Sequence, residues 1–131
     1  NLPTGLTDVR QMWLELKVKA AGGRVIYASG VADASGYLPD GAVIFNTVFG
    51  DGKGNAVSNI AKAKEVLRDH RVPPMGLLTE TYTFAAPPAG KLSVEARLLY
   101  RSASQKLVDR LAGAGKLRLP VTVMAEARAD L

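Results

Sequence analysis

Residues 92–101, which read LSVEARLLYR, are the stretch that decides the fold. Apolar residues at the even positions alternate there with mostly polar residues at the odd positions. Successive side chains of a β-strand point to opposite faces of a sheet, so this period of two predicts a strand. We expect a central strand whose inner face buries Leu98 and Tyr100 and whose opposite face carries Arg97 and Arg101.

On both sides of this stretch, alternation or runs of β-branched and aromatic residues predict further strands. They cover residues 12–19, 24–29, 43–49, 78–84 and 117–128, and turns rich in Gly and Pro separate them. Pro120, within the last of these, marks a strand start or an edge. We therefore predict a mainly β fold: a single immunoglobulin-like β-sandwich of about seven strands with one or two short helices.

Two short segments are the candidate helices. Apolar spacing at residues 60–67 fits a helix, which must end before Pro73 and Pro74. Ser102 and Gln105 resemble a capping box, so a second helix is expected to begin there. Leu107, Val108 and Leu111 would form its apolar stripe, and Gly113 or Gly115 would end it.

The composition is typical of one globular domain spanning residues 1–131. Of 131 residues, 47% are hydrophobic and 22% are charged, close to the averages for soluble domains. The chain has no cysteine, which excludes disulfides, thiolate metal sites, a cysteine nucleophile and thioether-linked haem within it. One histidine leaves little for a metal or acid–base site. No apolar run reaches the roughly 18 residues of a membrane-spanning helix, so no transmembrane segment is predicted.

Positive charge is concentrated in the second part of the chain. Lys and Arg number 17 against 12 Asp and Glu, a net charge of +5. The first 51 residues carry −1 and the remaining 80 carry +6. A basic region can attract an anionic partner. However, no five consecutive residues are basic and the aromatic residues are not interleaved with the basic ones. A solvated surface is therefore favoured, and no nucleic-acid partner is predicted.

Three single residues invite a chemical interpretation. His70 could act as a catalytic base only with a partner nucleophile, and the chain has no Gly-x-Ser-x-Gly motif to supply one. We therefore predict that His70 is a solvent-exposed loop histidine. Glu80 shares a predicted strand face with apolar residues; if buried, it must pair with Arg97 or Arg71 or carry a raised pKa, whereas another register would leave it at the rim. Trp13 is either an exposed binding aromatic or buried between two layers. We predict no catalytic, cofactor-binding or metal-binding residue, and no enzyme.

Three segments, taken in order, resemble a known family. The first combines the Leu2-Pro3-Thr4-Gly5 turn with residues 10–14 (RQMWL) and 23–30 (GRVIYASG). The second is residues 66–76 (VLRDHRVPPMG), and the third is residues 96–101 (ARLLYR). Together they resemble the non-haem β-sandwich domain that follows the haem-binding region in many multihaem c-type cytochromes of the cytochrome c554-like family.

The resemblance implies a non-catalytic accessory domain of a longer extracytoplasmic electron-transfer protein, in the periplasm or at the cell surface. Because Cys-x-x-Cys-His is absent here, haem c is expected in the missing part of that protein and no haem ligand is carried over. The implied partners are the haem-binding region of the same polypeptide and, beyond it, redox proteins. The alternative is a stand-alone β-sandwich module that binds carbohydrate or acts as an adhesin.

The loop around the double proline is the predicted interdomain contact, with His70, Arg71, Pro73 and Pro74 as its residues. Consecutive prolines stiffen a loop, and a stiff loop loses little entropy on docking. Relatives usually carry a basic residue after the double proline, where this chain has Met75. Arg71 is therefore the residue expected to grip a carboxylate or haem propionate. The alternative is that Arg71 pairs with Asp69 or Glu80 inside the domain.

Overall fold

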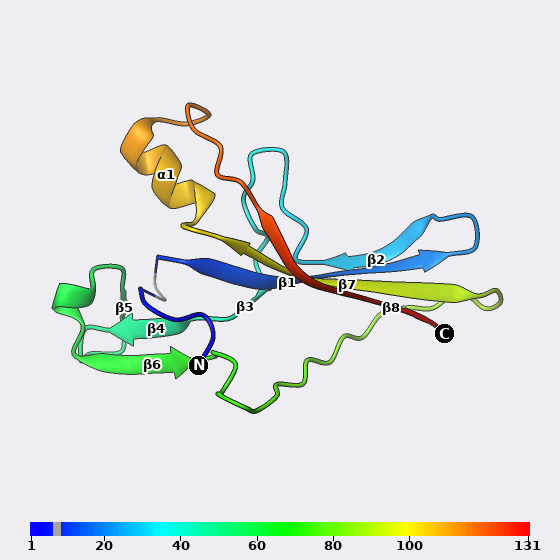
Figure 1. Cartoon of the computed structure of the whole chain (residues 1–131), viewed down its shortest axis with the longest axis horizontal. Coiled ribbons are helices and arrows are strands. Elements are labelled where there is room, and N and C mark those ends of the chain that lie inside the picture. The colour runs from blue at the N-terminus through cyan, green and yellow to red at the C-terminus, as the bar shows by residue number, and fades with distance from the viewer. Residues whose placement is uncertain (7–8) are drawn as a thin grey trace.

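The computed structural model describes residues 1–6 and 9–131, which form a mainly β fold (Figure 1). Within these residues, eight strands build two antiparallel sheets, accompanied by one α-helix and one 3₁₀ turn. The elements are β1 (Gln11–Ala20), β2 (Val25–Ser29), β3 (Val43–Ile44), β4 (Thr47–Gly50), β5 (Ala56–Val57), η1 (Ile60–Lys62), β6 (Glu65–Asp69), β7 (Leu92–Arg101), α1 (Gln105–Ala112) and β8 (Thr122–Asp130). The predicted mainly β, sandwich-like class is confirmed.

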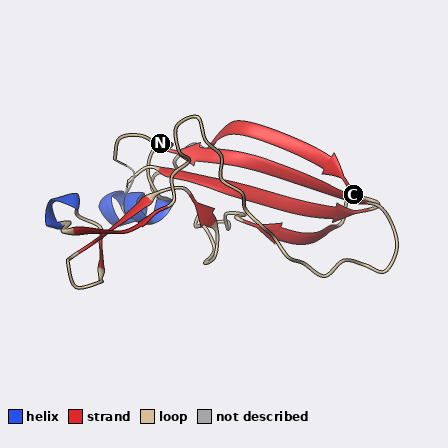
Figure 2. Cartoon of the chain, turned by 90° about the horizontal axis from the view of Figure 1, so that it is seen from below, coloured by secondary structure: helices blue, strands red, loops and turns tan. Residues whose placement is uncertain are grey.

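The larger sheet has the strand order β2-β1-β7-β8, with β3 also paired to β1. β1 and β7 pair antiparallel over their full length, from Gln11↔Arg101 to Ala20↔Leu92. This pairing confirms that residues 92–101 form a central strand. Figures 1 and 2 show the larger sheet as a long twisted layer, with the smaller sheet β5-β4-β6 and helix α1 gathered at one end.

The core lies where β1 begins, and both faces of β1 are buried there. Met12 on one face and Trp13 on the other are each 1% exposed. The indole N–H of Trp13 donates to the carbonyl oxygen of Gly30 at 3.0 Å, and the Arg101 guanidinium lies 5.1 Å from the ring centre. Trp13 is therefore a core residue, not an exposed binding aromatic.

The predicted burial of β7 is wrong in part. Leu98 and Tyr100 are half-buried, whereas Leu99 and Arg101 on the opposite face are buried. The loop before β3 covers that opposite face, because the Arg101 guanidinium donates to the carbonyl oxygen of Gly36 at 2.6 Å. It also donates to the side-chain oxygen of Gln11 at 2.7 Å. Satisfied donors allow the charged side chain to be buried.

Residues 43–49 form two strands rather than the single predicted one. Phe45 and Asn46 separate β3 from β4. The Phe45 N–H donates to the Met12 carbonyl in the larger sheet, and the Asn46 carbonyl accepts from the His70 N–H beside the smaller one. The chain therefore crosses from one sheet to the other at these two residues.

Residues 60–67 do not form the predicted helix. The segment starts as η1, capped by the Asn59 side chain, and continues as β6. β6 pairs with β4 from Thr47↔Asp69 to Gly50↔Glu65. This long-range pairing satisfies the backbone, and Val66 is 58% exposed, so the helical spacing of apolar residues does not mark a buried face.

Residues 78–84 run extended but join no strand in the described part of the chain, contrary to prediction. Their alternation has another cause. Tyr82 and Phe84 pack on Tyr27 of β2, with ring centroids 6.4 and 5.4 Å from it, while the intervening threonines are exposed. One side of the segment is thus covered, as it would be in a strand.

Helix α1 and β8 also begin later than predicted. Ser104, not Ser102, caps the helix, and its hydroxyl accepts the Leu107 N–H at 3.2 Å. Gly113 ends the helix as predicted, at φ 100. Leu111 of the expected apolar stripe is 78% exposed. β8 starts at Thr122, beyond Pro120, and forms an edge of the larger sheet as expected for a strand near a proline.

Candidate docking surface

The loop after β6 is tied to the body of the protein. The His70 N–H donates to the Asn46 carbonyl at 2.8 Å, and Val72 exchanges two backbone hydrogen bonds with Leu2. Pro73 and Pro74 then enter a turn closed by the Gly76 N–H, which donates to the Pro73 carbonyl at 3.2 Å. Both prolines are exposed.

Met75 stands in this turn with its side chain fully exposed, at a relative exposure of 109%. Its φ is 52°, a left-handed conformation that glycine adopts most readily. Holding another residue there costs about 1 kcal/mol or more. The turn therefore presents a large apolar side chain to solvent at a strained position.

Arg71 braces this loop from within. Its Nε donates to Oδ1 of Asp69 at 2.7 Å and its Nη2 donates to Oδ2 at 2.5 Å. These hydrogen bonds stabilise the ionised carboxylate and lower the pKa of Asp69 from 3.8 to about 2. Of the two roles considered for Arg71, pairing inside the domain is thus present. Its contact with another region stays a prediction.

His70 is not the solvent-exposed histidine that the sequence predicted. Its ring is half-buried and stacks on Phe45, with centroids 5.5 Å apart and planes 4° from parallel. Its Nε2 lies 2.8 Å from Oε1 of Glu80. Glu80 therefore pairs with His70 and with neither of the expected arginines, since Arg97 pairs with Glu15. The pair links the end of β6 to the 77–84 segment.

An apolar trough of about 500 Å³ lies between that segment and the larger sheet. The sheet contributes Leu14, Leu16 and Leu98, and the covering segment contributes Leu77, Leu78 and Tyr82. Phe45, Val72, Gly76 and Glu80 complete the lining. The Tyr82 hydroxyl is buried and finds no hydrogen-bond partner among the described residues. Burial is the first cause, and the Glu80 charge the second, of its raised pKa.

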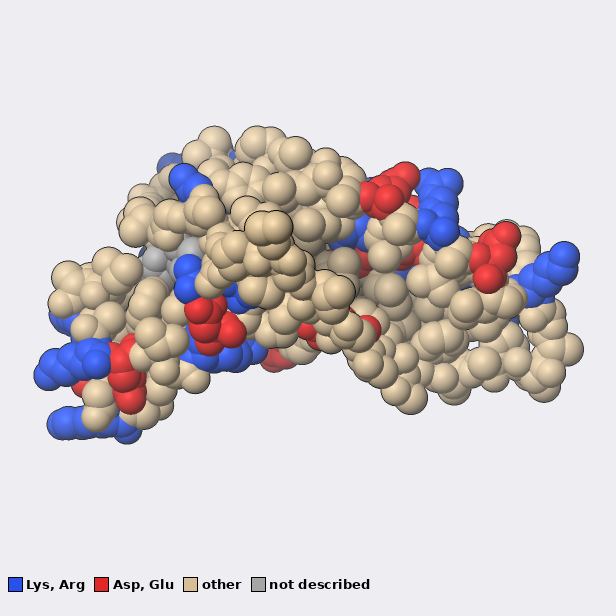
Figure 3. All heavy atoms as spheres, turned by 60° about the horizontal axis from the view of Figure 1, so that its bottom comes forward, with Lys and Arg blue, Asp and Glu red and all other residues tan. Residues whose placement is uncertain are grey.

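Exposed apolar side chains continue from the trough onto the surface. Met75 is fully exposed, and Leu77 and Leu78 are 78% and 40% exposed. Figure 3 shows a broad uncharged band across the lower right of this face, while charged side chains gather at the left end and along the upper edge. We call the trough together with Met75, Leu77 and Leu78 the docking surface. Exposed apolar side chains gathered around a trough are typical of interaction sites.

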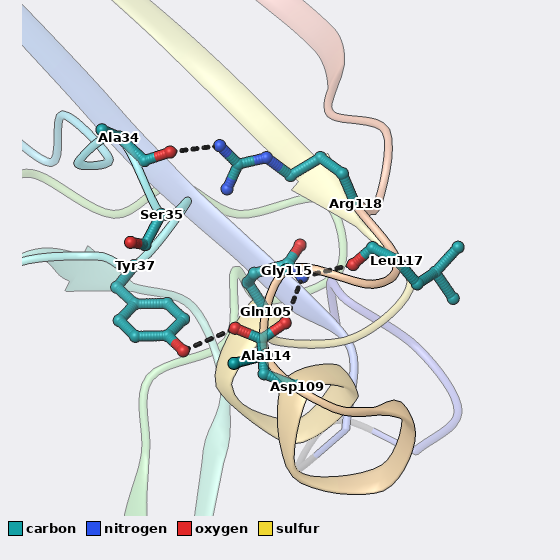
Figure 4. A pocket seen from close by; sticks show the side chains of 9 residues that line it. All are labelled: Ala34, Ser35, Tyr37, Gln105, Asp109, Ala114, Gly115, Leu117 and Arg118. Carbon is teal, nitrogen blue, oxygen red and sulfur yellow. Dashed lines mark hydrogen bonds between the residues drawn. The ribbon is translucent and has the colours of Figure 1, made fainter.

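A second hollow, of about 310 Å³, is polar and lies beside α1 (Figure 4). The Tyr37 hydroxyl donates to Oδ2 of Asp109 at 2.5 Å, and the Gln105 side-chain amide donates to Oδ1 at 2.9 Å. Accepting these bonds lowers the pKa of Asp109, and donating to Asp109 raises the pKa of Tyr37. These two hydrogen bonds tie the loop that carries Tyr37 to α1, so we call Tyr37, Gln105 and Asp109 a structural clamp.

Sequence reasoning missed Gln105 as the centre of this clamp. The residue is 2% exposed, donates to the Leu117 carbonyl at 2.6 Å and accepts the Leu119 N–H at 3.1 Å. Its position three residues after Ser102 suggested a helix cap instead. The sequence did offer one signal for this role, namely a glutamine in the first turn of a helix that is followed by a glycine-rich loop.

The described residues do not fit a c-type haem, which is attached through cysteine thioethers. The chain has no cysteine, and its one imidazole, on His70, is engaged by Phe45 and Glu80. Among residues 1–6 and 9–131, no group of His, Asp and Glu is arranged to hold a metal ion. No helix in that part of the chain is long and apolar enough to cross a membrane.

Comparison with known proteins gives one informative match. No family model matches the chain, and no curated protein is significantly similar. Among solved structures, a penta-heme cytochrome c552 from Thermochromatium tepidum superposes with a TM-score of 0.70 at 22% identity. The match covers 99% of this chain and 32% of that protein. The chain therefore shares the fold of about one third of a cytochrome and spans only that part of its length.

Proposed function

We propose that the chain is a haem-free, non-catalytic accessory domain of an extracytoplasmic multihaem cytochrome of the c554-like type. The observation that carries the proposal is the structural match of the whole chain to one third of a penta-heme cytochrome. Because these residues contain no cysteine for thioether attachment, the proposal includes haem c and electron transfer in another part of the longer protein.

In this proposal the docking surface packs against the haem-binding region of the same polypeptide. The exposed apolar side chains of Met75, Leu77 and Leu78 beside the trough support this assignment. The rigid Pro73–Pro74 turn, braced by Arg71 and the His70–Glu80 pair, holds Met75 in place as an apolar anchor.

The full open reading frame provides the first test. Several Cys-x-x-Cys-His motifs outside residues 1–131 would support the proposal, and their absence would contradict it. The 131-residue chain alone, expressed with haem-maturation machinery, should purify colourless and without Soret absorbance, since thioether attachment requires cysteine.

A matched pair of variants in the full-length protein tests the docking surface. Leu77 and Leu111 are both 78% exposed, but Leu77 lines the trough and Leu111 lies on α1. We expect Leu77→Asp to loosen the contact with the haem-binding region, seen as faster proteolysis between the two and shifted haem potentials. Leu111→Asp should leave both unchanged. Identical behaviour of the two variants would count against this surface.

A further inference from the structure

The edge strand β8 has one occupied side and one open side. Among the described residues it pairs with β7 alone, from Tyr100↔Thr122 to Ser93↔Asp130. All nine of its residues are exposed. A long exposed edge presents backbone N–H and C=O groups to which another strand can bond. Pro120 and the bulge at Met124 disturb only the start of this edge.

The two faces of β8 differ in their chemistry. Glu126 and Arg128 lie on one face, opposite Arg97 and Glu95 of β7. Ala125, Ala127 and Ala129 lie on the other. Arg128 lies 3.6 Å from Glu126 and 3.9 Å from Glu95, while its side chain is 69% exposed and that of Glu126 is 45% exposed. Both charges therefore remain accessible at the edge.

We propose that β8 pairs antiparallel with β8 of a second copy, about a two-fold axis at Ala127. A two-fold interface is self-complementary, so each contact occurs twice. In this register Glu126 of each copy lies directly opposite Arg128 of the other, which places two pairs of opposite charges on one face. On the other face Ala125 lies opposite Ala129, and Ala127 lies opposite its own copy. Residues 123–131 take part.

The neighbouring registers are less favourable for the same charges. Centring the axis on Glu126 places two glutamates opposite each other, and centring it on Arg128 does so with two arginines. The latter register also sets Glu126 opposite Asp130. An axis at Ala129 restores opposite charges, between Arg128 and Asp130, but pairs only residues 127–131. The charge pattern and the number of paired residues together thus select Ala127.

Sedimentation of the 131-residue chain from about 1 µM to about 1 mM tests the proposal, a range that covers stable and transient dimers. We expect a reversible dimer. Glu126→Arg and Arg128→Glu should each weaken it about tenfold or more, because each sets like charges opposite one another. Mixing the two variants restores opposite charges and should recover the dimer as a heterodimer. A monomer at every concentration, or a dimer indifferent to both charge reversals, would overturn the proposal.

A cysteine probe tests the register separately. The chain has no native cysteine, so Ala127→Cys introduces the single thiol. Directly opposed residues in an antiparallel pair have Cα atoms roughly 4.5–5.5 Å apart, within reach of a disulfide. Ala127→Cys should form a covalent dimer rapidly under mild oxidation, whereas Ala21→Cys, an exposed position in the β1–β2 turn, should not. Equal rates for the two variants would contradict the pairing.

Discussion

Asp69 shows how one carboxylate organises the loop that carries the docking surface. It accepts two hydrogen bonds from the Arg71 side chain and a longer one from the Thr47 hydroxyl. Charge-assisted, bidentate pairs of this kind have fixed geometry. The loop therefore keeps its shape before any partner binds, which suits a surface that docks with little loss of entropy.

The Asp69–Arg71 pair predicts a pH dependence of stability. The folded-state pKa of Asp69 is lowered to about 2 from 3.8, so the folded chain binds the proton less readily than the unfolded chain. The contribution of the pair is therefore present above about pH 4 and lost as the pH falls toward 2. Asp69→Asn should lower the free energy of unfolding at pH 6 but not at pH 2, measured by urea titration. The same deficit at both pH values would contradict this account.

Leu99, rather than Leu98, is the residue of β7 on which the core depends. Leu99 is 4% exposed, whereas Leu98 lines the open trough. Leu99→Ala should therefore cost about 2–5 kcal/mol of unfolding free energy, through lost burial and a residual cavity. Leu98→Ala should cost less, because its side chain already faces an opening. Denaturation midpoints of the two variants decide the matter, and the reverse order would show that the burial of the two faces is misassigned.

At the scale of elements, Gln105 fastens α1 to the chain that leads into β8. Its amide satisfies both the Leu117 carbonyl and the Leu119 N–H. Gln105→Ala should lower stability by about 1–3 kcal/mol, because backbone groups lose their partners. Hydrogen exchange at the Leu119 amide should become faster. Arg110→Ala, at an exposed position of the same helix, serves as the control. An unchanged exchange rate of the Leu119 amide in the Gln105→Ala variant would contradict the role of Gln105 in the clamp.

Elements were predictable from the sequence where local pattern and long-range pairing agree. Residues 92–101 alternate and lie between two strands, so their prediction as a central strand is confirmed. Residues 78–84 alternate equally well but belong to no strand. One side of this segment is covered because Tyr82 and Phe84 stack on Tyr27, and this produces the same alternation as pairing within a sheet. The strand at residues 65–69 was not predicted, because the spacing of apolar residues within it does not indicate its pairing with β4.

The candidate site was predictable only in outline. The double proline marked the loop, and Asp69 was one of two partners considered for Arg71. The stacking of His70 on Phe45 and its bond to Glu80 join residues 10 or more positions apart. Such contacts depend on how the chain crosses between the sheets at Phe45 and Asn46, which residue types alone do not reveal.

At the scale of the whole molecule, two of the places that leave apolar side chains at the surface carry the proposals. One is the docking surface, with Met75, Leu77 and Leu78 beside the trough, and the other is the edge strand β8. Exposed apolar surface on this scale is typical of a domain that functions against other protein surfaces. The two places are neighbours in the larger sheet, because Leu98, which lines the trough, pairs with Ala125 of β8.

Hydrogen exchange across residues 76–84, compared between the isolated chain and the full-length haem-loaded protein, tests the central claim most directly. These residues belong to no strand, so their amides should exchange rapidly in the isolated chain, except that of Gly76, which donates to the Pro73 carbonyl. The proposal predicts clear slowing in the full-length protein, with the turn at residues 51–55 unchanged as an internal control. Equal exchange of residues 76–84 in both forms would show that no haem-binding region packs on the docking surface and would contradict the account.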